Sequence, residues 1–113
     1  VCAAIDARDG QTAYAGSKRA ITIWMRRHVV EYAADGVRLN AVAPGMALTP
    51  LIEDWLTEQA DPEQALAQVV NAIPLGRLAS PEDVAGAVSY LASNDARYIT
   101  GISIPVDGGY TAQ

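Results

Sequence analysis

One junction constrains the fold of this chain most: a helix that passes directly into a strand. Apolar residues recur every three or four positions over residues 13–35, which predicts a helix, and Gly36 follows as its C-terminal cap. Residues 37–43 are largely apolar and predict a strand. Pro44 and Gly45 end this strand, because the pair cannot continue a ladder and favours a turn. A helix followed at once by a strand is half of a β-α-β unit, so the predicted fold class is α/β.

The stretch over residues 46–74 is broken into pieces by prolines. Two short amphipathic helices are predicted within it, over 51–59 and 62–71, and Asp61 is the expected cap of the second. Pieces of this kind between core elements commonly form a lid over a binding site, here a substrate lid. An ordinary surface excursion is the alternative interpretation.

A closing helix and an edge strand are predicted over residues 81–106. Residues 80–83 read Ser-Pro-Glu-Asp, which is a capping signature ahead of an apolar helical face. Residues 102–106 alternate as a short strand, and Pro105 indicates a sheet edge, where its missing amide hydrogen leaves no ladder bond unmade. With the tail of a strand predicted over residues 1–5, the strands number at most three, too few for a parallel sheet covered on both faces. We therefore expect the C-terminal part of a larger α/β domain, or a sheet that another chain completes.

Composition argues against several classes of function. The 113 residues carry a net charge of −5 with a pI near 4.6, and their arginines are scattered, so nucleic-acid binding has no basic patch to rest on. No signal peptide or apolar run of membrane-spanning length is visible. Cys2 is the single cysteine, which rules out an internal disulfide and favours the cytoplasm. His28 is the one histidine, and no metal site is expected.

Tyr14 and Lys18 stand four residues apart in the predicted helix and therefore share one face of it. Lys18 is the only lysine in the sequence. A phenol ionises well above neutral pH unless a neighbouring cation stabilises the phenolate, as an ammonium one turn away does. Such a pair can protonate a forming alkoxide or deprotonate an alcohol. Spacing alone also fits a packed tyrosine beside a solvated lysine.

In its motifs the chain resembles the C-terminal half of a classical short-chain dehydrogenase/reductase. Tyr14-x-x-x-Lys18 matches the active-site motif of that family, and residues 37–45, Val-Arg-Leu-Asn-Ala-Val-Ala-Pro-Gly, match its strand and turn. Thr49 sits where a threonine is expected, and residues 74–109 match the closing helix and strand. Four signals in register are specific although each is weak alone. The resemblance implies that residues 1–113 are part of one NAD(P)-binding domain, a Rossmann-type doubly wound parallel sheet in three α/β/α layers, incomplete in this chain.

Carried over by position, the resemblance implies a role for each motif residue. Tyr14 would be the general acid/base, and Lys18 would hold the nicotinamide ribose. The nicotinamide and its carboxamide would be bound by Pro44, Gly45, Ala47 and Thr49. Hydride would pass between NAD or NADP and a carbonyl or alcohol carbon, because the cofactor supplies the difficult chemistry while the protein orients it.

The resemblance also implies a class of substrate and an assembly. The residues expected to face the substrate are Met46, Leu51, Ile52 and Trp55. Their apolar character implies a steroid-like compound or an aliphatic or aromatic ketone or aldehyde. Residues 9–18 and 36–40 are similar to the bacterial 3α-hydroxysteroid dehydrogenase/carbonyl reductase branch. A homodimer or homotetramer is expected, with neither a nucleic-acid nor a membrane partner.

The sequence departs from the family pattern at its start. The glycine-rich pyrophosphate turn, the residue that selects NAD or NADP and the relay asparagine are not found, and Val1 stands near the position of the catalytic serine unless that serine lies upstream. We therefore expect the chain to be part of an oxidoreductase and to be inactive by itself. The alternative is a non-catalytic remnant acting as a structural or interaction module, which dinucleotide binding would distinguish.

Overall fold

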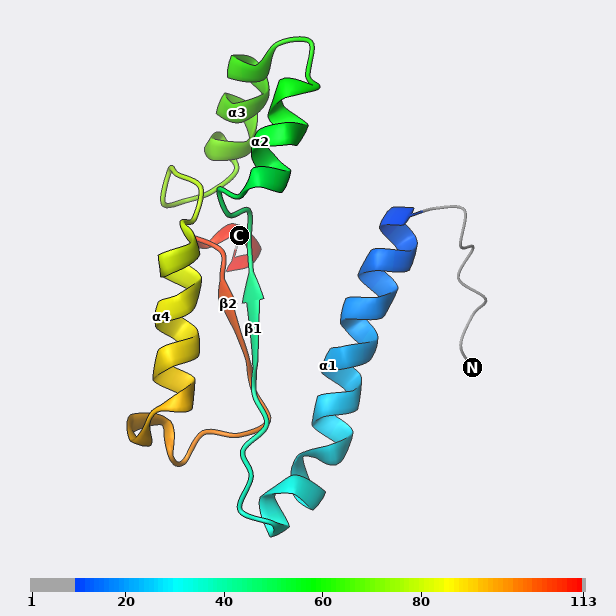
Figure 1. Cartoon of the computed structure of the whole chain (residues 1–113), viewed down its shortest axis with the longest axis vertical. Coiled ribbons are helices and arrows are strands. Elements are labelled where there is room, and N and C mark those ends of the chain that lie inside the picture. Colours follow the sequence, from blue (N-terminus) through cyan, green and yellow to red (C-terminus); the bar gives the residue numbers. More distant parts are fainter. Residues whose placement is uncertain (1–9, 113) are drawn as a thin grey trace. The chain divides into compact units, whose positions relative to one another are not determined.

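The computed structural model describes residues 10–112 (Figure 1). In chain order its elements are α1 (Gly10–Ala34), β1 (Ala41–Pro44), α2 (Pro50–Thr57), α3 (Pro62–Asn71), α4 (Pro81–Ala92), the 3-10 turn η1 (Asn94–Ala96), β2 (Ser103–Val106) and the 3-10 turn η2 (Tyr110–Ala112). Contacts divide the chain into two compact units. The first runs as far as Ala41 and includes Ile99–Ile102, and the second comprises Val42–Tyr98 with the chain from Ser103 onward.

Helix α1 ends in the glycine cap that the sequence predicts. Gly36 has a φ of 74°, a left-handed conformation that glycine adopts without steric cost. The amide of Gly36 donates to the carbonyl of Ala33 at 3.0 Å, and that of Val37 donates to Tyr32 at 2.9 Å. This pair of bonds is a Schellman motif, which satisfies the last carbonyls of the helix and turns the chain towards β1. The helix runs from Gly10 to Ala34, where residues 13–35 were expected.

The strand predicted over residues 37–43 is shorter and lies later, at Ala41–Pro44. Before it, side chains take the place of part of the backbone ladder. Leu39 donates its amide to the Thr100 hydroxyl at 3.0 Å. The amide side chain of Asn40 donates to Ile99 O at 2.9 Å and accepts from the Ile102 amide at 3.3 Å. The prediction of the strand's start was wrong because these bonds reach a segment about 60 residues away.

Strands β1 and β2 form a two-stranded parallel sheet. Ala41 donates its amide to Ile102 O at 2.9 Å, and Gly45 donates to Val106 O at 3.0 Å, which sets the register at both ends. Backbone groups alternate in direction along a strand, so the nitrogen of Pro105 lies on the side of β2 away from β1. The missing amide hydrogen of this proline therefore leaves no bond to β1 unmade, as the sequence indicated.

Three helices accompany the sheet in the second unit. Helices α2 and α3 contact each other as a hairpin, and α4 contacts β2 (Figure 1). The predicted caps of α3 and α4 are confirmed: Asp61 accepts from the Gln64 amide at 2.9 Å, and Ser80 with Asp83 forms a capping box. Helix α3 has the predicted bounds, whereas α2 spans Pro50–Thr57 where residues 51–59 were expected.

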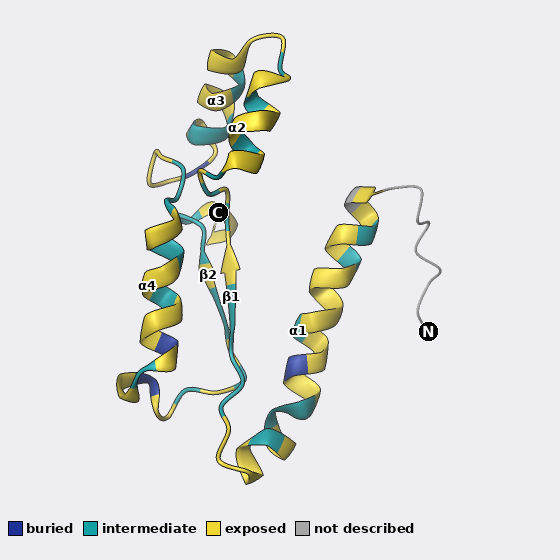
Figure 2. Ribbon diagram, viewed as in Figure 1, coloured by how far each residue is buried: buried dark blue, intermediate teal, exposed yellow. Residues whose placement is uncertain are grey.

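Little of the described chain is buried (Figure 2). Its buried hydrophobic residues are Met25 in the first unit and Ile73, Leu91 and Ala96 in the second. Large apolar side chains such as Leu51 are exposed. This agrees with the expectation that the helices have too little sheet to pack on. None of the described helices combines the length and hydrophobicity that crossing a bilayer requires.

The bonds of Asn40 make a testable contribution to stability. We expect Asn40→Ala to lower the free energy of unfolding by about 1–3 kcal/mol, because Ile99 O and the Ile102 amide both lose a partner. Urea denaturation with a fitted slope measures this change. Asn94→Ala, at an exposed position in η1, is the matched control and should change the free energy by less than about 0.5 kcal/mol. Equal effects of the two substitutions would contradict the role given to Asn40.

Candidate functional site

The structure places Tyr14 and Lys18 together on one face of α1. The ammonium of Lys18 lies 5.3 Å from the centroid of the Tyr14 ring. Tyr14 is 67% exposed, so within its own unit the phenol is open to a ligand. The Ser17 hydroxyl donates to Tyr14 O at 2.7 Å and does not engage the phenol. The alternative interpretation was a tyrosine packed at the start of the helix. Among the described residues, nothing buries the Tyr14 side chain in that way.

The turn that follows β1 approaches the end of β2 more closely than a side chain would permit. A Cβ atom added at Gly45 would lie 2.8 Å from both Cα and Cβ of Asp107. Real Cβ atoms essentially never come that close to another heavy atom, so only glycine fits here without a shift of the Asp107 backbone. The Pro44-Gly45 turn is thus held against β2 by backbone packing and by the hydrogen bond from Gly45 to Val106.

Asp107 organises the turn that follows β2. Its carboxylate accepts from the Thr111 hydroxyl at 2.6 Å, from the Thr111 amide at 3.0 Å and from the Gly109 amide at 3.0 Å. The bond from the Thr111 hydroxyl is the largest of the effects that lower the pKa of Asp107. Gly108 has a φ of 62°, and a Cβ there would lie 2.6 Å from Ile73 Cγ2. Leu75 also donates its amide to Gly108 O at 3.1 Å, so this turn contacts the segment that follows α3.

The segment after the Pro-Gly turn is held by an isolated parallel bridge between Ala47 and Ala79. Ala79 donates to Met46 O at 2.9 Å and accepts from the Leu48 amide at 2.8 Å. In this pattern the amide and carbonyl of Ala47 itself point away from Ala79, because neighbouring peptide groups alternate. Thr49 is the N-cap of α2, yet its side chain makes no capping hydrogen bond. The bridge thus leaves the Ala47 peptide groups out of its two hydrogen bonds, and the capping of α2 does not use the Thr49 hydroxyl.

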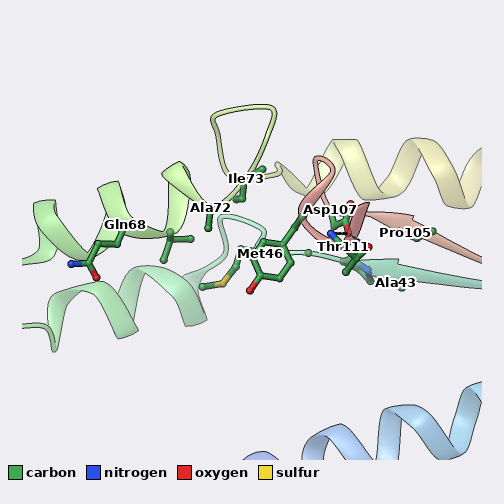
Figure 3. A pocket seen from close by; sticks show the side chains of 12 residues that line it. Ala43, Met46, Gln68, Ala72, Ile73, Pro105, Asp107 and Thr111 are labelled. Carbon is green, nitrogen blue, oxygen red and sulfur yellow. Dashed lines mark hydrogen bonds between the residues drawn. The ribbon is translucent and has the colours of Figure 1, made fainter. Parts of the chain in front are cut away.

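A cavity of about 660 Å³ opens beside this turn in the second unit. In Figure 3, Gln68 lies at the α3 end of the cavity, Asp107 and Thr111 lie at the β2 end, and Met46 lies between them. Most lining residues are apolar. The complete lining is Ala43, Pro44, Gly45, Met46, Gln68, Val69, Ala72, Ile73, Pro105, Asp107, Tyr110 and Thr111.

The structure brings some of the predicted site residues together. Pro44, Gly45 and Met46 line the cavity. The other residues predicted to face substrate lie on α2, and they line neither this cavity nor a neighbouring one of about 540 Å³: Leu51, Ile52 and Trp55. Four residues of the lining were not predicted from the sequence: Gln68, Val69, Tyr110 and Thr111. The apolar face of α3 was a signal for Val69, whereas nothing local indicated Tyr110.

The close approach at Gly45 generates a prediction with a matched control of opposite sign. Gly45→Ala should destabilise the protein by about 1–3 kcal/mol, because the new methyl displaces the Asp107 backbone. Gly86 lies in α4, and apart from its chain neighbours and the backbone of its own helix nothing lies within 4 Å of its Cβ position, so Gly86→Ala should stabilise by about 0.5–1 kcal/mol. Urea denaturation of both variants is the measurement. A Gly45→Ala protein as stable as the Gly86→Ala protein would contradict this, because it would show that the backbone at Asp107 can move away from the new methyl group without cost.

Comparison with known proteins relates this geometry to a family. The family model described as "Enoyl-(Acyl carrier protein) reductase" matches residues 1–111. Oxidoreductase UcpA of Salmonella typhimurium is 43% identical over 104 residues, which are 90% of this chain and 40% of that protein. The chain therefore spans about 40% of the length of this relative.

Solved structures are similar to this chain in both sequence and fold. A short-chain dehydrogenase/reductase family oxidoreductase from Burkholderia thailandensis is 39% identical with a TM-score of 0.82, and the match covers 89% of this chain and 39% of that one. A putative NAD(P)-dependent gluconate 5-dehydrogenase from Beutenbergia cavernae, with bound NADP, is 37% identical with a TM-score of 0.81, covering 90% and 39%. These likenesses confirm the predicted fold class, a partial Rossmann-type α/β fold. Together with the family match over residues 1–111, they show that the chain belongs to the short-chain dehydrogenase/reductase family.

Proposed function

We propose that the complete protein is an oxidoreductase that transfers hydride between NAD or NADP and a carbonyl or alcohol compound. The observation that carries this proposal is the pair of Tyr14 and Lys18, one helical turn apart, with an exposed phenol and an ammonium 5.3 Å from its ring. Membership of the family supports the reaction class, and the NADP bound to the Beutenbergia cavernae relative supports the cofactor.

Tyr14 handles the proton in this reaction. The dinucleotide, when bound, supplies or accepts the hydride. In reduction the phenol of Tyr14 gives its proton to the oxygen of the substrate carbonyl and becomes a phenolate, and in oxidation the phenolate takes the proton of the alcohol and becomes a phenol. Lys18 presents ammonium donors to ribose hydroxyls. Both side chains lie on a single rigid helix, which preserves their relative geometry.

The nicotinamide end of the cofactor fits the segment over residues 44–49. Gly45 lets the turn lie close to β2, and the outward peptide groups of Ala47 suit a carboxamide, which needs one donor and one acceptor. The Thr49 hydroxyl makes no capping bond and adds a further polar contact. Pro44 belongs to the same turn and lines the cavity.

The cavity favours an apolar substrate. Met46, Val69 and Ile73 contribute apolar surface, and Gln68 with Thr111 provides polar groups that would orient a small number of oxygens. A steroid-like compound, or an aliphatic or aromatic ketone or aldehyde, meets these requirements. Assembly as a homodimer or homotetramer and a cytoplasmic location stay predictions.

Substitution of the pair tests the proposal in the complete protein. Tyr14→Phe should lower turnover by a factor of about 10² or more while dinucleotide affinity is retained, because only the proton-carrying hydroxyl is lost. Lys18→Ala should reduce both turnover and dinucleotide affinity. Steady-state rates on a panel of steroid, aliphatic and aromatic ketones give the first quantity, and titration calorimetry gives the second.

Tyr32→Phe is the matched control, since it removes a phenolic hydroxyl from the same helix at a position outside the proposed site. It should leave both quantities unchanged. A Tyr14→Phe protein with near-normal turnover would refute the assignment of the acid/base. A complete protein that binds neither NAD nor NADP would favour the alternative of a non-catalytic interaction module.

A further inference from the structure

The segment that would meet the nicotinamide depends on one residue of a distant loop. Ala79 forms both hydrogen bonds of the bridge, to Met46 O and from the Leu48 amide. The outward direction of the Ala47 peptide groups follows from these two bonds. Any displacement of Ala79 therefore rotates or releases the groups that the proposed function assigns to the carboxamide.

The two peptides that flank Ala79 are each held by one member of an ion pair. On one side, Arg77 Nη1 donates to Leu78 O at 3.0 Å. On the other, Asp83 Oδ2 accepts from the Ser80 amide at 2.7 Å, and the Asp83 amide donates to Ser80 Oγ at 3.3 Å. Ala79 is thus fixed from both directions along the chain.

Arg77 and Asp83 also bind each other in a two-pronged arrangement. Nη1 of Arg77 lies 2.6 Å from Oδ2 of Asp83, and Nη2 lies 3.0 Å from Oδ1. This geometry fixes orientation as well as distance, which a single contact would not do. The Arg77 guanidinium and the Ser80 amide hold the pKa of Asp83 well below its usual range, so the carboxylate is charged at any working pH.

Exposure decides what this ion pair contributes. The side chains of Arg77 and Asp83 are 57% and 33% exposed. Pairs at exposed positions typically add about 0–1 kcal/mol to stability. Global stability is therefore a poor explanation of an arrangement in which these two side chains bind each other and also the peptides on both sides of Ala79. Local positioning explains it directly.

We propose that Arg77 and Asp83 are positioning residues that hold Ala79, and through it the Met46–Leu48 segment, in the conformation that binds the nicotinamide carboxamide. This inference rests on the proposed function for the identity of the ligand. A cavity of about 540 Å³ is lined by Met46, Ala79 and both members of the pair, which places them around one space.

Arg77→Met tests the proposal in the complete protein, because it retains the length of the side chain and removes its donors. The amides of Leu48 and Ala79 should exchange with deuterium faster in this variant, while amides within α4 keep their protection. Dinucleotide affinity, measured by titration calorimetry, should fall about five- to tenfold, which corresponds to about one net hydrogen bond. Arg77→Lys should show a smaller effect on both readouts, since lysine keeps the positive charge but cannot form the two parallel hydrogen bonds to Asp83.

Arg97→Met is the matched control: its guanidinium donates to Asn94 O at 3.2 Å at the end of η1, outside both cavities. It should change neither readout. Unchanged exchange of the Leu48 and Ala79 amides in Arg77→Met would overturn the positioning role. If Arg77→Met does not fold, the same exchange measurement on Arg77→Lys decides the question. Failure of the unsubstituted protein to bind NAD or NADP would instead overturn the proposed function, and the exchange result would still report on Ala79.

Discussion

The parallel pairing of β1 with β2 is the interaction on which the second unit depends. Its register places Gly45 beside Asp107, although they are far apart in the sequence. Because Gly45 has no Cβ, the two backbones touch, and the turn after Asp107 then reaches Ile73 and Leu75. Three segments meet there, and the cavity is bounded by all of them.

Backbone contacts, more than apolar burial, define this region. Ile73 is the buried apolar residue among those that line the cavity. The other constraints are amide-to-carbonyl bonds at Gly45, Leu48, Ala79 and Leu75, together with the carboxylates of Asp83 and Asp107. Geometry set in this way changes little with the size of individual side chains, provided that the glycines and the two carboxylates are kept.

Local signals in the sequence predicted the elements whose causes are local. The Gly36 cap, the Asp61 cap of α3 and the capping box of Ser80 with Asp83 each involve residues within a few positions of one another. The same holds for Tyr14 and Lys18, whose contact follows from helical spacing. The start of β1 could not be predicted, because Asn40 bonds to residues about 60 positions away.

The contacts of the cavity illustrate the same limit. Tyr110 of η2 and Gln68 of α3 line one space because the fold brings these two elements to it, and neither residue carries a motif. Arg77 was visible as part of a family signature, yet its bonds to Leu78 and Asp83 depend on the path of the loop. Residue type was therefore readable from the sequence, while the partners of each residue required the fold.

The hairpin of α2 and α3 is joined to its surroundings by main-chain bonds at both of its ends. Leu48 binds Ala79 just before the hairpin, and Leu75 binds Gly108 just after it. Neither bond involves a side chain of the hairpin itself. The helices over residues 50–71 can consequently change in length and in chemistry as one unit, while the main-chain bonds on either side of them stay the same. Differences in ligand preference among related chains would then concentrate between Leu48 and Leu75. Chimaeric proteins that exchange the hairpin should be joined at these two residues.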